Sequence, residues 1–402
     1  MSRALFLVLL LLLLPMWTGQ GHGLSLLTQM GVAAMACLSY QWLWGQGGML
    51  SFGQAVYTGA GAYLAVHLMR MADAGWPVPM VLVPLLAGLG TAFLAWALGG
   101  ISTRRPGAAL AMITLGLGEL AWALAPVFPS VFGGEGGLSA DRTAGLSLGI
   151  WQGANPWHLY ALVCVYLLLA LWGLGKVEHS PLGLYVRAVR EQAGRLAHVG
   201  PDPHRVRWTA FVLAGGIAGV AGGLSAMVFE IVTPEAFNPV RSGELLLFTV
   251  LAGSRHWAGA LLGGALTVLA HTTLPQWTPA SGLYLGMLFM VLVVRAPQGL
   301  AGLALQWWRR EPGRSLTWPK PVACLQAVAA LGALGFAGGL VEMAYQYQQL
   351  STVGSVMHWL GLTLKLDQPL HWMGMTLAAL VWAGGWAITS AHRRHATKEA
   401  QA

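Results

Sequence analysis

Residues 180–207 read SPLGLYVRAVREQAGRLAHVGPDPHRVR and form the one long polar stretch of an otherwise apolar chain. Apolar residues recur in it at the three- and four-residue spacing of an α-helix, and charged residues fall on the opposite face. That face consists of Arg187, Arg190, Glu191, Arg195 and His198. Ser180 and Pro181 suit the start of a helix, and Gly200 suits its end in a left-handed turn. The stretch predicts one capped amphipathic helix that needs a groove or a membrane surface for its apolar face.

The rest of the chain has the composition of a membrane protein. Of its 402 residues, 56% are hydrophobic and 9% are charged. In an ordinary soluble domain roughly 25% are charged. Several apolar runs approach the ~20 residues that cross a bilayer as a helix, and the 54 glycines suit close helix packing. We expect an all-α, polytopic integral membrane protein with about 10 core transmembrane helices plus 2 C-terminal ones.

The basic residues indicate the topology. The formal net charge of +8 comes from 22 Lys and Arg against 14 Asp and Glu, and the basic residues stand in loops between apolar runs. With the N-terminus in the cytosol, all of them face the cytosol except Arg70, Arg142, Arg241 and Lys365. This asymmetry places residues 180–207 and both termini in the cytosol, and it explains the charge without nucleic acid as a partner.

The order of the apolar runs predicts three regions. Residues 1–23 form a signal-anchor or first transmembrane helix, for which we favour no cleavage, although cleavage stays open. Residues 24–303 form the core and include the cytosolic loop 176–207. Residues 304–402 form an extension with two further transmembrane helices, near 322–341 and 372–390. The segment 242–273 either crosses the membrane twice or is re-entrant.

The segment 45–69 is unusually rich in glycine. Each glycine in a helix interior costs about 1 kcal/mol relative to alanine, so this helix is either broken or held by tight packing against a neighbour. Broken helices at membrane depth are tolerated where they line a cavity. If the helix is broken, Ser51, Gln54 and Tyr57 are candidates for a translocation path.

Two acidic residues lie inside predicted membrane segments. Glu119 stands in the apolar run 108–127, and Glu244 stands in a short segment that glycines interrupt. An ionisable residue inside a span is costly and marks a candidate functional site. For Glu119 the alternative is a structural carboxyl group, satisfied by backbone groups near Gly116 and Gly118.

The run 208–229 carries Gly215, Gly219 and Gly223 at four-residue spacing. Residues four apart lie on one face of a helix, and small residues there allow two helix backbones to approach closely. The pattern predicts close contact with another helix of the same bundle.

Signatures of catalysis and of an internal motor are absent from the sequence. Gly173-Leu174-Gly175-Lys176 does not complete a phosphate-binding loop, and no H-E-x-x-H or C-x-x-C is present. Cys37, Cys164 and Cys324 stand alone, so we expect no metal site, cofactor or catalytic residue. A transporter without visible ion coupling would have to be driven by a separate protein that supplies the energy. The alternative is a secondary transporter or channel whose amphipathic helix lies on the inner leaflet.

Several motifs occur together in one order along the chain. They are Arg187-Ala188-Val189-Arg190-Glu191 within the amphipathic stretch, LSFGQAVYTGAGAY at 50–63, ITLGLGE at 113–119, GGEGGLS at 133–139 and APQGLAGL at 296–303. In these motifs residues 24–303 resemble the permease subunits of branched-chain amino acid ATP-binding cassette importers of the LivM-like kind. Related permeases serve urea and short amides, so those substrates stay open.

The resemblance implies an inner-membrane permease of a bacterium, set in the lipid bilayer. It also implies two cytosolic ABC ATPase subunits, a second homologous permease subunit and a periplasmic substrate-binding protein as partners. The helix at 182–200 would dock into an ATPase, through residues Arg187, Val189, Arg190, Glu191, Ala193, Ala197 and Gly200. In this docking, Arg187, Arg190 and Glu191 would make the polar contacts while the apolar face closes against the ATPase. The sequence departs from the family at Gln192-Ala193-Gly194-Arg195, where an acidic, alanine-rich turn is more usual.

Overall fold

The structure is a computed structural model. It describes residues 21–143, 155–254, 257–277, 281–295 and 299–302, together with short pieces between 338 and 381. The predicted first helix at 1–23 lies almost wholly outside the described residues. The chain divides into two compact units, Met1–Leu269 with Phe289–Trp308 and Ala270–Leu288 with Arg309–Ala402.

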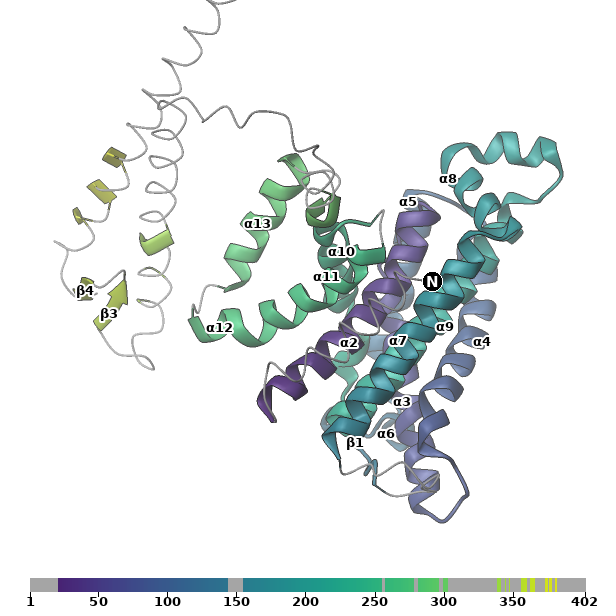
Figure 1. Cartoon of the computed structure of the whole chain (residues 1–402), viewed down its shortest axis with the longest axis horizontal. Coiled ribbons are helices and arrows are strands. Elements are labelled where there is room, and N and C mark those ends of the chain that lie inside the picture. Colours follow the sequence, from purple (N-terminus) through teal and green to yellow (C-terminus); the bar gives the residue numbers. More distant parts are fainter. Residues whose placement is uncertain are drawn as a thin grey trace, which may run out of the picture. The chain divides into compact units, whose positions relative to one another are not determined.

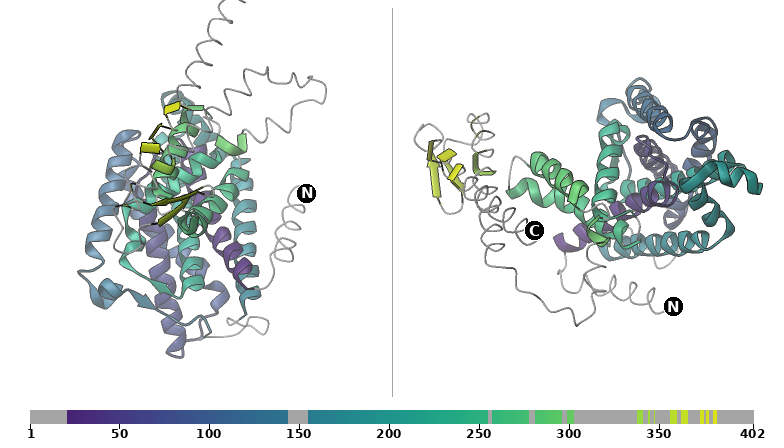
Figure 2. Two further views of the ribbon diagram at one scale, coloured as in Figure 1. Left: turned by 90° about the vertical axis from the view of Figure 1, so that its left-hand side faces the viewer. Right: turned by 90° about the horizontal axis from the view of Figure 1, so that it is seen from above.

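The first unit is a bundle of α-helices that run side by side (Figures 1 and 2). Its helices are α2 (His22–Tyr40), α3 (Gln54–Asp73), α4 (Val83–Ser102), α5 (Ala108–Leu124), α6 (Pro129–Phe132), α7 (Pro156–Glu178), α8 (Pro181–Val199), α9 (Pro203–Phe229), α10 (Pro239–Ala252) and α11 (Trp257–Val268). A π-helical segment, η1 (Gln41–Gln46), continues α2, and short 3-10 turns are η2 (Met80–Leu82), η3 (Gly134–Gly136) and η4 (Pro234–Phe237).

Helix α9 is the centre of the bundle, since it packs against α4, α3 and α2. It begins at Pro203, and the side chain of Asp202 caps it by accepting a hydrogen bond from the His204 N–H at 2.9 Å. The sequence predicted a start at Trp208, five residues later, because the polar first turn does not look like a membrane segment. The helix ends at Phe229, and its C-cap residue, Glu230, is a non-glycine residue in the left-handed conformation (φ 57°).

The described residues contain five helices long and apolar enough to cross a membrane, or six if the bent pair of α5 and the segment after it forms one span. These helices support a multi-pass membrane protein, and one of them, Pro203–Phe229, contains the apolar run expected at 208–229. Helix α10 is shorter, at 14 residues. Such a helix is about 21 Å long at 1.5 Å per residue and falls short of the ~30 Å hydrocarbon core.

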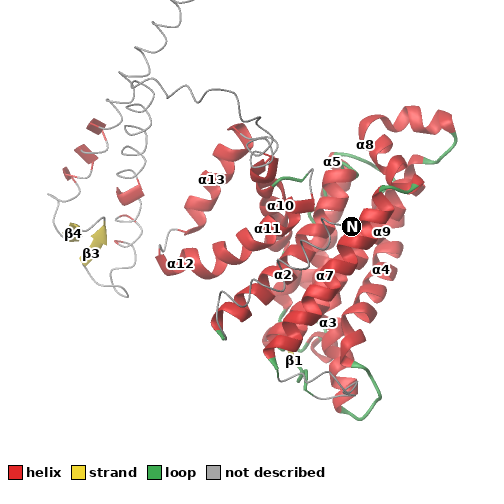
Figure 3. Ribbon diagram, in the orientation of Figure 1, coloured by secondary structure: helices red, strands yellow, loops and turns green. Residues whose placement is uncertain are grey.

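A two-stranded sheet lies at the end of the bundle opposite α8 (Figures 1 and 3). Strands β1 (Leu138–Ser139) and β2 (Ile231–Val232) pair antiparallel, with Leu138 opposite Val232. Three aromatic rings, of Tyr63, Phe132 and Phe237, pack together at centroid distances of 5.0–5.7 Å. The segments 128–142 and 230–238 thus meet at one end of the bundle.

In the second unit the structure describes α12 (Leu274–Trp277), α13 (Ser281–Arg295), which begins in it, and a hairpin of β3 (Val356–Trp359) with β4 (Leu362–Lys365). The π-helical segment η5 (Leu269–Thr273) leads into α12. The Tyr284 hydroxyl donates a hydrogen bond to the Gly338 carbonyl at 3.1 Å. Most residues of the two helices predicted near 322–341 and 372–390 lie outside the described part of the chain.

Candidate functional site

Helix α8 is two helical segments and not the single helix that the sequence predicted. Gln192 has an extended backbone (φ −152°, ψ 89°), which separates residues 181–191 from 193–199. Gly194, just beyond the break, lowers helix stability by about 1 kcal/mol, and no neighbouring group packs against it. The ends agree better with the prediction, because Pro181 opens the helix and Gly200 (φ 121°) ends it.

The first segment of α8 packs on the chain's own bundle. Gly183, Val186 and Val189 are buried, and Val186 and Val189 belong to the main hydrophobic core. A side chain at Gly183 would meet the carbonyl oxygens of Val177 and Glu178, so only glycine allows this approach to the end of α7. The apolar face expected to close against an ATPase is therefore largely covered by the chain itself.

Two arginines of the expected docking face also bind the chain itself. The Arg187 guanidinium lies 3.6 Å from the Glu178 carboxylate and donates a hydrogen bond to the Glu178 carbonyl at 3.1 Å. The Arg190 guanidinium donates a hydrogen bond to the Gly45 carbonyl, and its aliphatic stem covers Gly48. Both arginines hold the first segment of α8 against α7 and η1.

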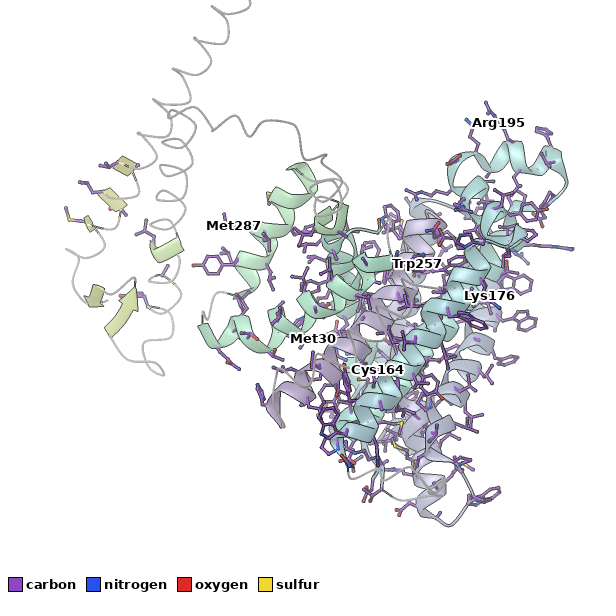
Figure 4. All side chains as sticks on the ribbon, viewed as in Figure 1. Met30, Cys164, Lys176, Arg195, Trp257 and Met287 are labelled. Atoms are coloured by element: carbon purple, nitrogen blue, oxygen red, sulfur yellow. The ribbon has the colours of Figure 1, made fainter. Side chains whose placement is uncertain are left out.

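The second segment of α8 is exposed over most of its length. Leu196 anchors it and is buried, whereas Val199 is 77% exposed. From Glu191 onward the exposed residues are Glu191, Gln192, Gly194, Arg195, Ala197, His198, Val199 and Gly200, while Ala193 is half-buried. Arg195 points away from the bundle (Figure 4).

The glycine-rich segment is broken, as one of the two interpretations of the sequence had it. Residues 47–53 are not helical, and α3 begins at Gln54. Side chains satisfy the backbone there: the Phe52 N–H donates to Thr114 Oγ1 at 3.1 Å, and the Ala55 N–H donates to Ser242 Oγ at 2.8 Å. The break is buried between α5 and α10, where neighbouring elements replace the lost helical hydrogen bonds.

Ser51, Gln54 and Tyr57 gather at this break and are 0%, 1% and 2% exposed. The Gln54 amide donates to Ser39 Oγ at 3.0 Å, and the Tyr57 ring meets the Phe211 ring edge-on at 5.6 Å. In this conformation Gln54 and Tyr57 tie α3 to α2 and α9, and the Ser51 hydroxyl accepts a hydrogen bond from the Gly53 N–H at 3.3 Å.

Glu119 lies on an exposed face of α5 together with Met112, which is 72% exposed, and Leu120, which is 54% exposed. Within the described part of the chain no residue hydrogen-bonds or pairs with its carboxylate. Gly118 packs next to Phe52, so Glu119 sits beside the buried break and faces away from it. The alternative was that backbone groups near Gly116 and Gly118 satisfy this carboxyl group, and among the described residues no such contact is present.

Glu244 is half-buried on α10, two residues beyond the serine that caps the α3 backbone. Helix α10 packs against both α3 and α5. The structure thus brings Ser51, Gln54 and Tyr57 together and places Glu119 and Glu244 on the two helices that flank them.

The three glycines of α9 face α4. A Cβ atom at Gly215 would meet Ala95, one at Gly219 would meet Thr91, and one at Gly223 would lie 3.0 Å from the Pro84 Cα. Gly219 also faces Gly61 of α3, so the backbones of α3, α4 and α9 approach closely there.

The sequence analysis missed Glu178 and the pair Tyr40 and Gln41. Glu178 ends α7, and its carboxylate contacts three other elements. Tyr40 and Gln41 are fully buried, and the Tyr40 hydroxyl and both polar atoms of the Gln41 side chain have no hydrogen-bond partner. The one available signal for Glu178 was an acidic residue at the end of an apolar helix, directly before the amphipathic stretch.

A metal-binding cluster of three or more His, Cys, Asp or Glu side chains does not occur among the described residues. Cys37 and Cys164 are buried as free thiols in the bundle. Their burial agrees with their isolation in apolar segments of the sequence.

A bundle of apolar helices with a buried helix break and a polar, two-part helix at one end has the features of a membrane permease. The family described as branched-chain amino acid transport system / permease component matches residues 23–296, and the chain belongs to it.

Curated relatives agree with this membership. The chain is 27% identical over 292 residues to the high-affinity branched-chain amino acid transport system permease protein LivM of Salmonella typhimurium. This match covers 67% of this chain and 68% of that protein. It is 27% identical over 325 residues to LivM of Escherichia coli, covering 74% of this chain and 75% of that protein. A shorter match, 26% over 155 residues, joins it to the probable branched-chain amino acid transport permease protein LivH of Methanocaldococcus jannaschii. No solved structure matches the chain.

Proposed function

We propose that this protein is the permease subunit of an ATP-binding cassette importer that moves branched-chain amino acids across a bacterial inner membrane. Two separate cytosolic ATPase subunits drive it, and both of its termini lie in the cytosol. Membership of the family and the names of the relatives support the substrate class. The observation that carries the proposal is α8, whose first segment is fixed to the bundle while its second segment presents polar groups outward.

The ATPase docks on the outer surface of α8. Because Arg187, Val189 and Arg190 are engaged with the chain itself, the docking contacts come from Glu191 and the second segment. Arg195 and His198 supply polar contacts, and the exposed Val199 supplies an apolar one. Such a surface, with few apolar anchors and a charged rim, suits an interface between separate subunits.

The translocation path runs along α5 and α10, beside the break before α3. An ionisable residue at the centre of a lipid-facing helix costs about 2.5–3.5 kcal/mol, so the exposed Glu119 faces protein or water and not lipid. We assign this face to the second, homologous permease subunit, with the path between the two subunits. Ser51, Gln54, Tyr57 and Glu244 border the path when the break opens.

The periplasmic substrate-binding protein docks at the opposite end, where β1 pairs with β2. Arg142 holds that end together, since its guanidinium donates a hydrogen bond to the Met227 carbonyl at 3.1 Å and lies 3.6 Å from the Glu230 carboxylate. A fixed end of this kind allows a partner to bind without ordering the loop first.

The test is purification of the tagged protein in a gentle detergent, followed by reconstitution of whatever copurifies in liposomes. A second permease and ATPase subunits in the sample, with ATP-dependent uptake of leucine when the cognate binding protein is supplied, are expected. Uptake of urea in place of leucine would overturn the substrate. Uptake by the chain alone without ATP would overturn the importer class.

A further inference from the structure

Glu178 joins three elements through one carboxylate. The Trp257 indole N–H, at the start of α11, donates a hydrogen bond to Glu178 Oε2 at 2.7 Å, and the Gln46 amide, at the end of η1, donates to Oε1 at 3.4 Å. The Arg187 guanidinium of α8 lies 3.6 Å from the same Oε1. The Glu178 side chain is only 17% exposed, so water screens these contacts only in part. Trp257 is labelled in Figure 4.

The stability of α7 does not explain an acidic residue here. Glu178 is the last residue of that helix, and the carbonyl groups at a helix C-terminus repel a negative charge by about 0.3–1 kcal/mol. The carboxylate therefore works against its own helix. Its stabilising contacts are those with α8, η1 and α11.

A second contact joins α8 to η1 at the next turn. The Arg190 guanidinium binds the Gly45 carbonyl, and a side chain at Gly45 would meet the Ser254 carbonyl on the other side. The end of η1 is thus held between α8 and the turn after α10. If α8 moved while η1 stayed in place, the contact of Arg190 with Gly45 and the contact of Arg187 with Glu178 would both break.

The segment η1 is poised for such a movement. A π-helix is rare and often marks a functional site. Gln41 opens it, with both polar atoms of its amide buried and unpaired, which costs about 1–3 kcal/mol for each such group. At its other end η1 continues directly into the buried break at 47–53.

We propose that Glu178 is a positioning residue that transmits the movement of α8 to η1, and through η1 to the break before α3. This inference rests on the proposed function, because it takes the ATPase as the source of the movement. The route runs from Arg187 through Glu178 to Gln46, and Arg190 at Gly45 runs parallel to it. Trp257 fixes the carboxylate so that displacement of the arginine is passed on.

The experiment measures leucine molecules taken up per ATP hydrolysed, in the complete assembly in liposomes, for Glu178→Ala, Glu178→Gln and the control Lys176→Gln. Lys176 lies on the same helix, and its ammonium sits over the Trp172 ring of that helix at 4.1 Å. Loss of the carboxylate contacts is expected to lower the ratio about tenfold while ATP hydrolysis continues, the scale of one hydrogen bond to a charged group. Glu178→Gln keeps neutral hydrogen bonds, so its ratio is expected to fall between those of Glu178→Ala and the unaltered protein. The ratio for Lys176→Gln is expected to match that of the unaltered protein.

A ratio unchanged in both Glu178 variants would overturn the inference. Should Glu178→Ala fail to assemble, the ratio of the milder Glu178→Gln decides, alone and combined with Trp257→Phe, which removes the indole donor. Equal melting temperatures with a lowered ratio exclude a merely structural role. If the unaltered assembly itself shows no ATP-driven uptake, the proposed function fails, whereas a normal unaltered assembly with normal Glu178 variants overturns only the inference.

Discussion

The Gln54 side-chain amide donates a hydrogen bond to the Ser39 hydroxyl at 3.0 Å, and so joins the first residue of α3 to the last turn of α2 across the buried break. Gln54→Leu removes the donor in a site where water does not replace it. A buried hydrogen bond of this kind contributes about 0.5–1.5 kcal/mol. We expect a lower melting temperature of the purified chain. An unchanged melting temperature would show that the bond does not hold the break.

Glu119→Gln tests the exposed face of α5. The Glu119 carboxylate contacts nothing within the described part of the chain, so the substitution should change the free energy of unfolding of the isolated chain by less than about 0.5 kcal/mol. Uptake by the complete assembly should nevertheless fall. Normal uptake would remove Glu119 from the path, and a large loss of stability would show a structural role.

The glycines of α9 provide a test of the packing. At Gly219 a Cβ atom would overlap Thr91 of α4, whereas at Gly173 of α7 no atom lies within 4 Å of the added Cβ. Gly219→Ala should therefore destabilise the chain by about 1–3 kcal/mol. Gly173→Ala, the matched control, should be neutral or slightly stabilising. Thermal unfolding of both variants in the same detergent gives the comparison, and equal melting temperatures would contradict the packing.

Substitutions at two valines of α8 distinguish a role in folding from a role in docking the ATPase. Val189 is 9% exposed in the core, and Val199 is 77% exposed beyond the break. Val189→Asp buries a charge, so a lower yield of folded protein is expected. Val199→Asp should leave the yield intact and lower the amount of copurified ATPase. If both variants fold and bind the ATPase alike, the second segment is not the docking surface.

The sequence predicted features that depend on local pattern. The apolar runs indicate the helices of the bundle, and Pro181 and Gly200 set the two ends of α8. The glycines at 45–69 marked the place of the break but left its existence open, because glycine serves tight packing as well as chain reversal. These features need only the residues near them in the chain.

Features that depend on tertiary contact were out of reach. The Gln192 backbone leaves the helix although the apolar spacing continues past it, so the pattern predicted one helix. The partners of Glu178 are 9, 79 and 132 residues away in the chain. No spacing rule joins such residues. The burial of Val189 likewise depends on which neighbour covers the apolar face, and an amphipathic pattern does not name the neighbour.

The most direct test of the central claim is photo-crosslinking from position 198 in intact membranes. His198 is exposed on the second segment of α8, so a photoreactive residue there should not disturb the bundle. The account predicts one cross-linked product that contains an ATP-binding cassette subunit, in cells that still take up leucine. Cross-links to lipid alone, with uptake intact, would contradict it and assign α8 to the membrane surface.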